Sequence, residues 1–214
     1  MIKWKNNLKK RAQTEMSQRG NDPSHDYAHA LNVLYNCEQI SAIEGGDMDI
    51  LYPAALFHDV VIYAKNHPKS GQAPEESAIL ARKILESEET YPVEKILAVE
   101  ECIRSCSFGK QDIPKTLEIA ILRDADRLAA TGAIAIMRTF ASSGQMSRPL
   151  YDYKDPFSVT RETDAQQYAL DLFYERLLVA RKVMYTETAK QLAESRTEFL
   201  ESFLAQLQKE LPNQ

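Results

Sequence analysis

Histidine is scarce in this chain, and its few copies lie close together. All four fall in the first third of the 214 residues. His25 and His29 are four residues apart, which places both imidazoles on one face of a helix. His58 is followed directly by Asp59 inside an apolar stretch, residues 48–63. An ionisable pair in such surroundings is costly unless it is neutralised, hydrogen-bonded or bound to a metal. A divalent cation resolves that cost by binding imidazole nitrogen and carboxylate oxygen together, and a buried histidine–carboxylate hydrogen bond is the alternative.

A second group of charged residues occurs far along the chain. Asp124 and Asp126, followed by Arg127, interrupt another apolar helical pattern. Because Asp124 is two residues from Asp126, the two carboxylates point in different directions from one helix. This motif and the histidine motifs must be brought together by the fold if they are to form one site.

The elements that carry these motifs are predicted to be helices, because apolar residues recur near a period of 3.6 and strand-like alternation is almost missing. Residues 48–63 are apolar nearly all round, which is typical of a helix in the middle of a bundle. Residues 64–74 are predicted to be a polar loop with a lid role, and residues 142–160 an irregular excursion. The sequence therefore predicts an all-α helical bundle. The expected helices are 22–44, opening at Asp22-Pro23-Ser24, then 48–63, 75–88, 92–105, 114–141, 161–184 and 187–210.

Composition narrows the class of protein. Hydrophobic residues make up 44% and charged residues 27%, which is typical of a soluble globular chain. A net charge of -5 argues against a protein that coats nucleic acid, although a bound metal can still attract a small anionic substrate. The chain has no apolar run of the roughly 18 residues that a membrane span needs, and its basic N-terminus lacks the apolar core of a signal peptide.

Three cysteines, without a CxxC pair, favour reduced thiols and a cytoplasmic location. Cys102 and Cys106 lie one helical turn apart. Burial as small apolar side chains is favoured over a shared metal for this pair.

The motifs, taken in order, resemble those of a known family. A histidine at position 29, the doublet in Ala54-Ala-Leu-Phe-His58-Asp59 and the distant Ala125-Asp-Arg-Leu128 resemble the HD superfamily of metal-dependent phosphohydrolases. The opening Ser24-His25-Asp26 and the string from Leu122 through Gly132 are similar to stand-alone bacterial HD hydrolases, some of which hydrolyse nucleoside triphosphates. The resemblance covers about residues 20–140.

This resemblance implies a ligand set and a domain. By position, His29, His58, Asp59 and Asp126 correspond to the family's metal ligands. Residues 1–214 would form a single HD-type domain, with a metal-binding core at about 20–140 and C-terminal helices at about 160–211 packing on it. One departure is Asn32, where the family often has an arginine.

The resemblance also bears on the metal. Family members with two metals use additional histidines between the doublet and the last aspartate, and here that interval contains only His67. One divalent ion is therefore expected, and Mn, Co, Ni, Fe, Zn and Mg are all compatible with the ligands.

Residues near the expected metal suggest a division of roles. His25 and Asp26 are the candidates for proton transfer, because the helix places His25 one turn from His29. A capping or structural role at the helix start is the alternative for His25. The candidate substrate-binding residues, which would neutralise phosphate charge or face the substrate, are Lys65, His67, Lys69, Asp124 and Arg127.

Plainer roles are open for these substrate-binding candidates. Lys65, His67 and Lys69 are also typical of a solvated loop, and Arg127 of a structural ion pair. Tyr151, Tyr153 and Phe157 could line a base or ribose, although packing against the bundle is favoured.

The expected function is a metal-dependent hydrolysis of a phosphate ester or phosphoanhydride of a nucleotide or similar small metabolite. The alternative is a metal-bearing sensor that binds a nucleotide without turnover. A di-iron oxygenase on the same scaffold ranks lowest, because it needs more histidine and aspartate ligands than this sequence offers. For the C-terminal helices, core packing or a homodimer surface is expected rather than catalysis.

Overall fold

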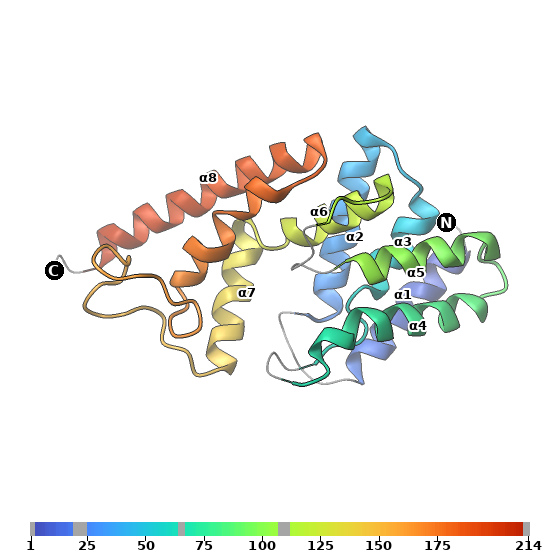
Figure 1. The fold of residues 1–214 in the computed structure, drawn as a ribbon, viewed down its shortest axis with the longest axis horizontal. Coiled ribbons are helices and arrows are strands. Elements are labelled where there is room, and N and C mark those ends of the chain that lie inside the picture. The colour runs from blue at the N-terminus through green and yellow to red at the C-terminus, as the bar shows by residue number, and fades with distance from the viewer. Residues whose placement is uncertain (1–2, 19–24, 64–66, 107–111, 212–214) are drawn as a thin grey trace. The chain divides into compact units, whose positions relative to one another are not determined.

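The computed structural model describes residues 3–18, 25–63, 67–106 and 112–211. Throughout these ranges the regular elements are helices, which confirms the predicted all-α class. The chain divides into two compact units, Met1–Asp126 and Arg127–Gln214 (Figure 1). The assignment of the whole chain to a single domain stays a prediction. None of the described helices is long and apolar enough to cross a bilayer.

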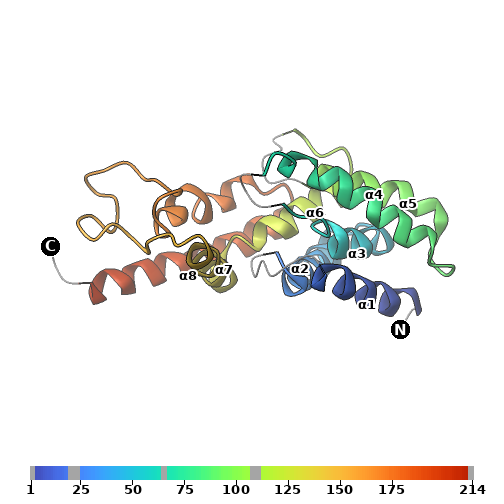
Figure 2. The ribbon, with the colours of Figure 1, turned by 90° about the horizontal axis from the view of Figure 1, so that it is seen from below.

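The first unit is built around α3. Its helices are α1 (Lys3–Ser17), α2 (Tyr27–Glu44), α3 (Met48–Phe57), η1 (Ser70–Gln72), α4 (Ala73–Glu86), η2 (Val93–Lys95), α5 (Ile96–Ser105) and α6 (Leu117–Leu128), the last of which ends in the second unit. α3 contacts α1, α2, α4 and α5, and α4 and α5 run side by side (Figure 2). Residues 51–57 of α3 are all buried. Its central place agrees with its uniformly apolar sequence.

α3 contains a proline in its interior, Pro53. Proline has no N–H, so the carbonyl of Asp49 cannot receive the usual helical hydrogen bond from position 53. The hydroxyl of Tyr91 donates to that carbonyl instead, at 2.8 Å. A side chain from the segment between α4 and α5 therefore satisfies the acceptor that the proline leaves over.

α1 is not among the predicted helices. Trp4, Leu8 and Ala12 lie four residues apart on it and are buried. The Trp4 ring meets the rings of Tyr52 and Tyr91 edge-on, with centroids 5.6 and 5.2 Å apart. The spacing of four is a helical signal, although the three apolar residues are widely diluted by basic and amide side chains.

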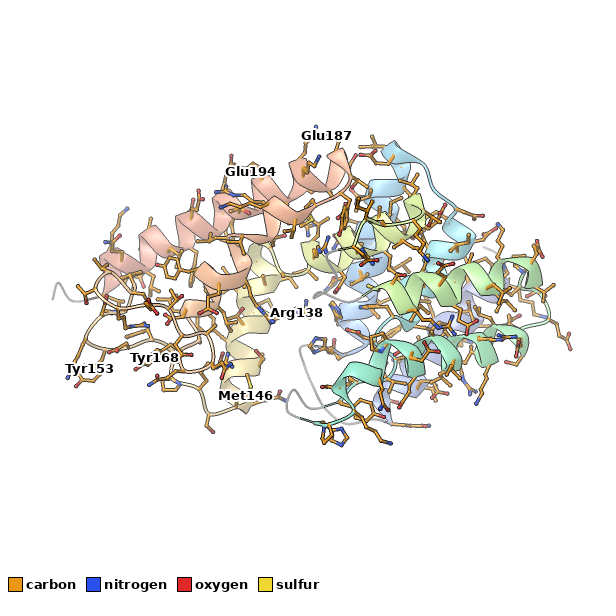
Figure 3. The ribbon with its side chains drawn as sticks, viewed as in Figure 1. Arg138, Met146, Tyr153, Tyr168, Glu187 and Glu194 are labelled. Atoms are coloured by element: carbon orange, nitrogen blue, oxygen red, sulfur yellow. The ribbon has the colours of Figure 1, made fainter. Side chains whose placement is uncertain are left out.

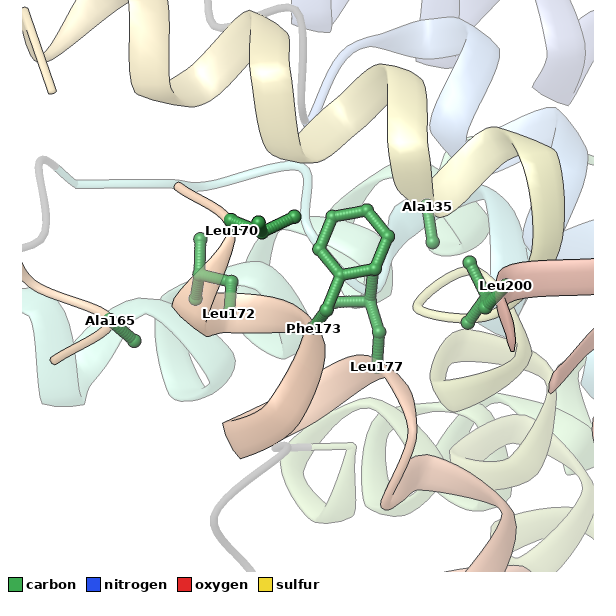
Figure 4. Packing of buried hydrophobic residues seen from close by; sticks show 7 residues of the cluster. All are labelled: Ala135, Ala165, Leu170, Leu172, Phe173, Leu177 and Leu200. Atoms are coloured by element: carbon green, nitrogen blue, oxygen red, sulfur yellow. The ribbon is translucent and has the colours of Figure 1, made fainter. Parts of the chain in front are cut away.

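The second unit has its own apolar core. Its helices after α6 are α7 (Gly132–Gln145), η3 (Phe173–Leu177), η4 (Ala180–Val183) and α8 (Glu187–Glu210). Phe173 and Leu177 lie in the middle of this core and face Ala135 of α7 and Leu200 of α8 (Figure 4). Phe173 also stacks on Phe203 of α8, with ring centroids 5.6 Å apart. η3 therefore takes the place in this core that a longer helix was expected to fill.

The prediction of one long helix over 161–184 is wrong. Its first part is irregular, and only the short η3 and η4 follow. The buried carboxylate of Asp171 accepts hydrogen bonds from Arg161 and from the backbone N–H of Asp164. Asp155 likewise accepts from the N–H groups of Val159 and Thr160. Side-chain acceptors so close to backbone donors compete with helical hydrogen bonds.

The irregular excursion predicted for 142–160 is confirmed, although α7 extends to Gln145 before it begins. Tyr151 and Phe157 pack against the core of the second unit, as the packing alternative predicts. Tyr153, which lies on the same segment, is exposed (Figure 3).

The prediction of one helix over 114–141 is also wrong, because the chain breaks between α6 and α7. Gly132 has a φ of +69°, a left-handed conformation that side chains with a Cβ rarely adopt. The carbonyl of Leu128 at the end of α6 accepts hydrogen bonds from Thr131 Oγ1 and from Arg196 of α8. The break is therefore both made possible by a glycine and fixed by an arginine.

Candidate metal centre

α2 positions the first histidine. The helix begins at Tyr27, and Asp26 is its N-cap, with its side chain accepting from the backbone N–H of His29 at 3.0 Å. This carboxylate satisfies one of the backbone donors that every helix start leaves over. The start signal expected at residues 22–24 lies outside the described residues. His29 is buried in the first turn of α2.

The doublet lies at the end of α3 rather than inside it. The predicted helix over 48–63 is wrong beyond Phe57, because His58 is the C-cap and a turn closes from the N–H of Val60 to the carbonyl of Phe57. Nδ1 of His58 lies 2.9 Å from the carbonyl of Ala55. That contact requires the proton on Nδ1, so Nε2 is the nitrogen left to bind a cation.

The two histidines and Asp126 of α6 converge on one point within the first unit. Their ligand atoms all lie within 4.8 Å of one another. Nε2 of His29 is 3.3 Å from Nε2 of His58 and 3.4 Å from Oδ1 of Asp126. Oδ2 of Asp59 faces the same two nitrogens, at 3.4 Å from His58 and 3.7 Å from His29. The structure thus brings together the four residues to which the sequence assigns the metal.

The spacing of these atoms fits a metal ion. Two donors that each lie about 2.1 Å from one ion, at an angle of about 90° to 110°, are about 3.0 to 3.4 Å apart. The separations that involve the histidine nitrogens range from 3.3 Å, between the two Nε2 atoms, to 3.8 Å, between His58 Nε2 and Asp126 Oδ1. Two imidazoles and two carboxylates also suit the divalent ions named above. A small inward shift of the side chains would complete the coordination.

The charges of the cluster depend on one another. Burial by itself lowers the pKa of His58, but the carboxylates of Asp59 and Asp126 outweigh it and raise that pKa to about 9. Burial raises the pKa of Asp59, and the imidazoles of His58 and His29 outweigh this effect and lower it. The pKa of Asp126 is lowered against the effect of burial by the same two imidazoles. Without a metal, the cluster at neutral pH therefore holds two carboxylates around a protonated His58.

The cluster has an inner and an outer side. The imidazoles of His29 and His58 are only 3% and 1% exposed, whereas the carboxylates of Asp59 and Asp126 are 31% and 21% exposed. Water and a substrate can therefore approach along the carboxylate side.

The two residues predicted to transfer protons, His25 and Asp26, both contact His29, but they do so in different ways. The half-buried ring of His25 meets the ring of His29 edge-on, with centroids 5.7 Å apart. The carboxylate of Asp26 caps α2, as described above, so it already has a structural role. The ring of His25 therefore lies against a histidine of the cluster, and its part in proton transfer stays a prediction.

Two of the predicted substrate-binding residues lie on the surface of the first unit. His67 is exposed and stacks on Tyr63, with ring centroids 4.8 Å apart, and its Nδ1 accepts from the backbone N–H of Lys69. Lys69 is exposed, and Lys65 lies outside the described residues. All three positions follow the doublet closely in the chain.

Asp124 and Arg127 are buried on α6. The guanidinium of Arg127 donates to the carbonyl of Val183 at 2.7 Å and lies over the ring of Tyr185, both in the second unit. These contacts to a carbonyl and an aromatic ring give Arg127 a structural role, and the ion pair considered from the sequence stays a prediction.

One supporting residue has no signal in the sequence motifs. Ser77 of α4 is buried, and its Oγ accepts from the N–H of Val61 at 3.0 Å and donates to the carbonyl of the same residue. Ser77 thereby holds the backbone two residues after Asp59. Only the fold brings α4 next to the doublet, so spacing along the chain could not reveal this contact.

Known proteins resemble this chain in both sequence and fold. The HD domain family model matches residues 26–131, a range that includes the four clustered residues. YpgQ of Bacillus subtilis strain 168 is 30% identical over 194 residues, which cover 88% of this chain and 85% of YpgQ. The crystal structure of YpgQ in complex with ADP has a TM-score of 0.74 at 27% identity, covering 99% of this chain and 97% of that one.

The crystal structure of an HD-superfamily hydrolase from Bacillus thuringiensis has a TM-score of 0.71 at 30% identity, covering 98% of this chain and 97% of that chain. The resemblance first seen in three short motifs therefore extends over nearly all of the protein. The chain belongs to the HD domain family.

Proposed function

We propose that this protein is a metal-dependent phosphohydrolase that acts on a phosphate ester or phosphoanhydride of a nucleotide or similar small metabolite. The observation that carries the proposal is the convergence of the nitrogen and oxygen donors of His29, His58, Asp59 and Asp126 at separations close to those around one ion. A divalent ion held there would supply Lewis acidity toward water and a phosphoryl oxygen, which phosphoester hydrolysis requires.

The residues of the chain supply the rest of the site. The Ala55 carbonyl fixes the tautomer of His58 and so the direction of its Nε2. The partly exposed carboxylates of Asp59 and Asp126 leave an approach for water and a phosphate group. His25 is the candidate to move a proton at this edge, because its ring lies against that of His29. His67 and Lys69 are candidate phosphate contacts from the segment that follows the doublet.

A nucleotide is the favoured substrate class for a separate reason. YpgQ, which shares nearly the full length of this chain, has been crystallised in complex with ADP.

The test is release of phosphate and pyrophosphate from a panel of nucleoside mono-, di- and triphosphates. Mn²⁺, Co²⁺, Ni²⁺ and Mg²⁺ are supplied in turn to the wild type and to Asp126→Asn. We expect turnover that depends on the metal and that falls by more than about 100-fold in Asp126→Asn. Loss of a metal ligand should lower activity more than loss of a residue that only orients a ligand. Asp49→Asn is the matched control, since that carboxylate pairs with Lys95 instead of the cluster.

The control should retain its turnover. A wild type that binds metal and nucleotide but releases no phosphate from any member of the panel would refute the hydrolase and favour the nucleotide-binding sensor.

A further inference from the structure

Asn36 is a buried polar residue that none of the sequence motifs includes. It lies on α2, seven residues after His29, so the two side chains project from nearly the same face two turns apart. Its side chain is 3% exposed. The amide Nδ2 donates to the carbonyl oxygen of Ala125 on α6 at 2.9 Å, across 89 positions of sequence.

The acceptor of this hydrogen bond is informative. A carbonyl within a helix can accept one backbone hydrogen bond and still has a second lone pair for a side chain. The contact from Asn36 is therefore not needed to complete α6 itself. What it does is hold the backbone of α6 at a fixed place against α2.

That place is next to a proposed metal ligand. Ala125 directly precedes Asp126, whose Oδ1 lies 3.4 Å from Nε2 of His29. His29 belongs to α2 and Asp126 to α6, so the separation of these two donors depends on how the two helices are aligned. A shift of about 1 Å between the helices would take the donors out of reach of a common ion.

We propose that Asn36 is a positioning residue of the metal centre, which sets the distance between His29 and Asp126 through the carbonyl of Ala125. This inference rests on the metal site of the proposed function. It gives a carboxamide that lies two helical turns after His29 on α2 a role in metal affinity, without contact to the ion.

The test compares Co²⁺ affinity with stability in two variants. Asn36→Leu keeps the branching and the number of heavy atoms of the side chain but removes its hydrogen-bond donor. Tyr52→Phe is the matched control, because it also removes a hydrogen bond from a buried side chain to a backbone carbonyl, that of Lys5, in the same unit. Co²⁺ binding is followed by its visible absorption, which also reports coordination geometry, and thermal unfolding is measured on the metal-free variants.

We expect Asn36→Leu to weaken Co²⁺ binding by about 10- to 100-fold and to change the absorption spectrum of the bound ion, as is typical when a residue that orients ligands is lost. Tyr52→Phe should lower the unfolding temperature and leave the affinity within about twofold of wild type. Equal Co²⁺ affinity and an unchanged spectrum in Asn36→Leu would overturn the inference and leave Asn36 with a structural role.

Two further outcomes are separable. If Asn36→Leu does not fold, Asn36→Ser decides by the same criterion, because its shorter side chain cannot reach the Ala125 carbonyl yet leaves room for water. If the wild type binds no Co²⁺, the metal centre itself is refuted and the inference with it. A wild type that binds Co²⁺ without hydrolysing any nucleotide refutes only the hydrolase.

Discussion

Nε2 of His29 lies 3.3 Å from Nε2 of His58, although α2 carries one imidazole and the other follows the end of α3. Two unprotonated ring nitrogens repel each other at this distance through their lone pairs, so the arrangement calls for a proton or a cation between them. Asp59 and Asp126 lie around the same two nitrogens and favour positive charge there. At this site a proton and a bound metal would therefore compete.

The first prediction concerns that competition. The carboxylates hold the pKa of His58 at about 9 in the metal-free protein, so a metal that binds at pH 7 must displace its proton. Metal affinity should rise about tenfold per pH unit up to about pH 9 and then level off. Calorimetry in buffers of different ionisation enthalpy measures the protons released. An enthalpy that does not depend on the buffer would show that His58 is already unprotonated.

The second prediction concerns the stability of the metal-free protein. A histidine whose pKa is raised by folding stabilises the fold fully below its unfolded pKa of about 6.5, and this contribution is lost as the pH rises through about 9. Unfolding in the presence of a chelator should show a loss of stability in this window that His58→Asn lacks. His67→Asn is the control, because that ring is exposed, and it should follow the wild type. Parallel profiles for wild type and His58→Asn would contradict the assignment.

The third prediction separates capping from catalysis at Asp26. Serine is as good an N-cap as aspartate, whereas alanine at this position costs about 1 kcal/mol of helix stability. If Asp26 acts only by capping α2 and orienting His29, Asp26→Ser should retain most of the turnover and Asp26→Ala should lose stability. Initial rates and denaturant unfolding measure the two effects. An equal, large loss of rate in both variants, without a difference in stability, would instead make Asp26 a proton-transfer residue.

The fourth prediction concerns the break between α6 and α7. Gly132→Ala should destabilise the second unit by about 1 to 3 kcal/mol, because a residue with a Cβ is strained at a φ of +69°. The new Cβ would also lie 3.2 Å from Arg196, the residue that caps α6. Gly144→Ala is the control: it lies in α7 with no atom near its Cβ position, and should stabilise by about 0.5 to 1 kcal/mol. Denaturant unfolding would contradict the prediction if both variants shifted in the same direction.

The fifth prediction concerns the irregular segment before η3. Asp171 is fully buried and accepts hydrogen bonds from Nη1 and Nη2 of Arg161, at 2.6 and 2.9 Å. Asp171→Ala should cost about 2 kcal/mol or more, because the partly exposed Arg161 loses its buried partner. Burial raises the pKa of Asp171 and Arg161 outweighs it, so the pKa is lowered and the contribution is lost only as the pH falls through that low value. Asp152→Ala, with a longer contact to Arg161 at 3.7 Å, should change stability less.

The candidate site could be predicted from the sequence where ionisable residues occur within an apolar helical pattern. The convergence of His29, the doublet and Asp126 could be predicted because ionisable residues are rare in apolar helices and the order of these residues along the chain resembles a family pattern. The contacts that orient these residues could not be found in this way. Asn36 reaches its acceptor across 89 positions, and periodicity does not report contacts between distant helices.

Two wrong helix predictions, for residues 161–184 and 114–141, have related causes. Residues 161–184 have a helical pattern of apolar residues, but Asp155 and Asp171 bind nearby backbone and guanidinium donors and stop the helix. The break after α6 depends on Arg196, which is distant in sequence from Leu128. In both places a polar contact decided where a helix ends.

The proline within α3 has a consequence for how the helices find their alignment during folding. Because Pro53 has no N–H, the carbonyl of Asp49 has no helical donor, and the hydroxyl of Tyr91 donates to it instead. If α3 were shifted by one residue, Tyr91 would meet a carbonyl that already accepts a helical hydrogen bond. The carbonyl of Asp49 would then be left without a donor. Pro53 and Tyr91 thus disfavour neighbouring registers of α3. Because His58 and Asp59 follow α3 directly, the same two residues help to set the positions of this doublet.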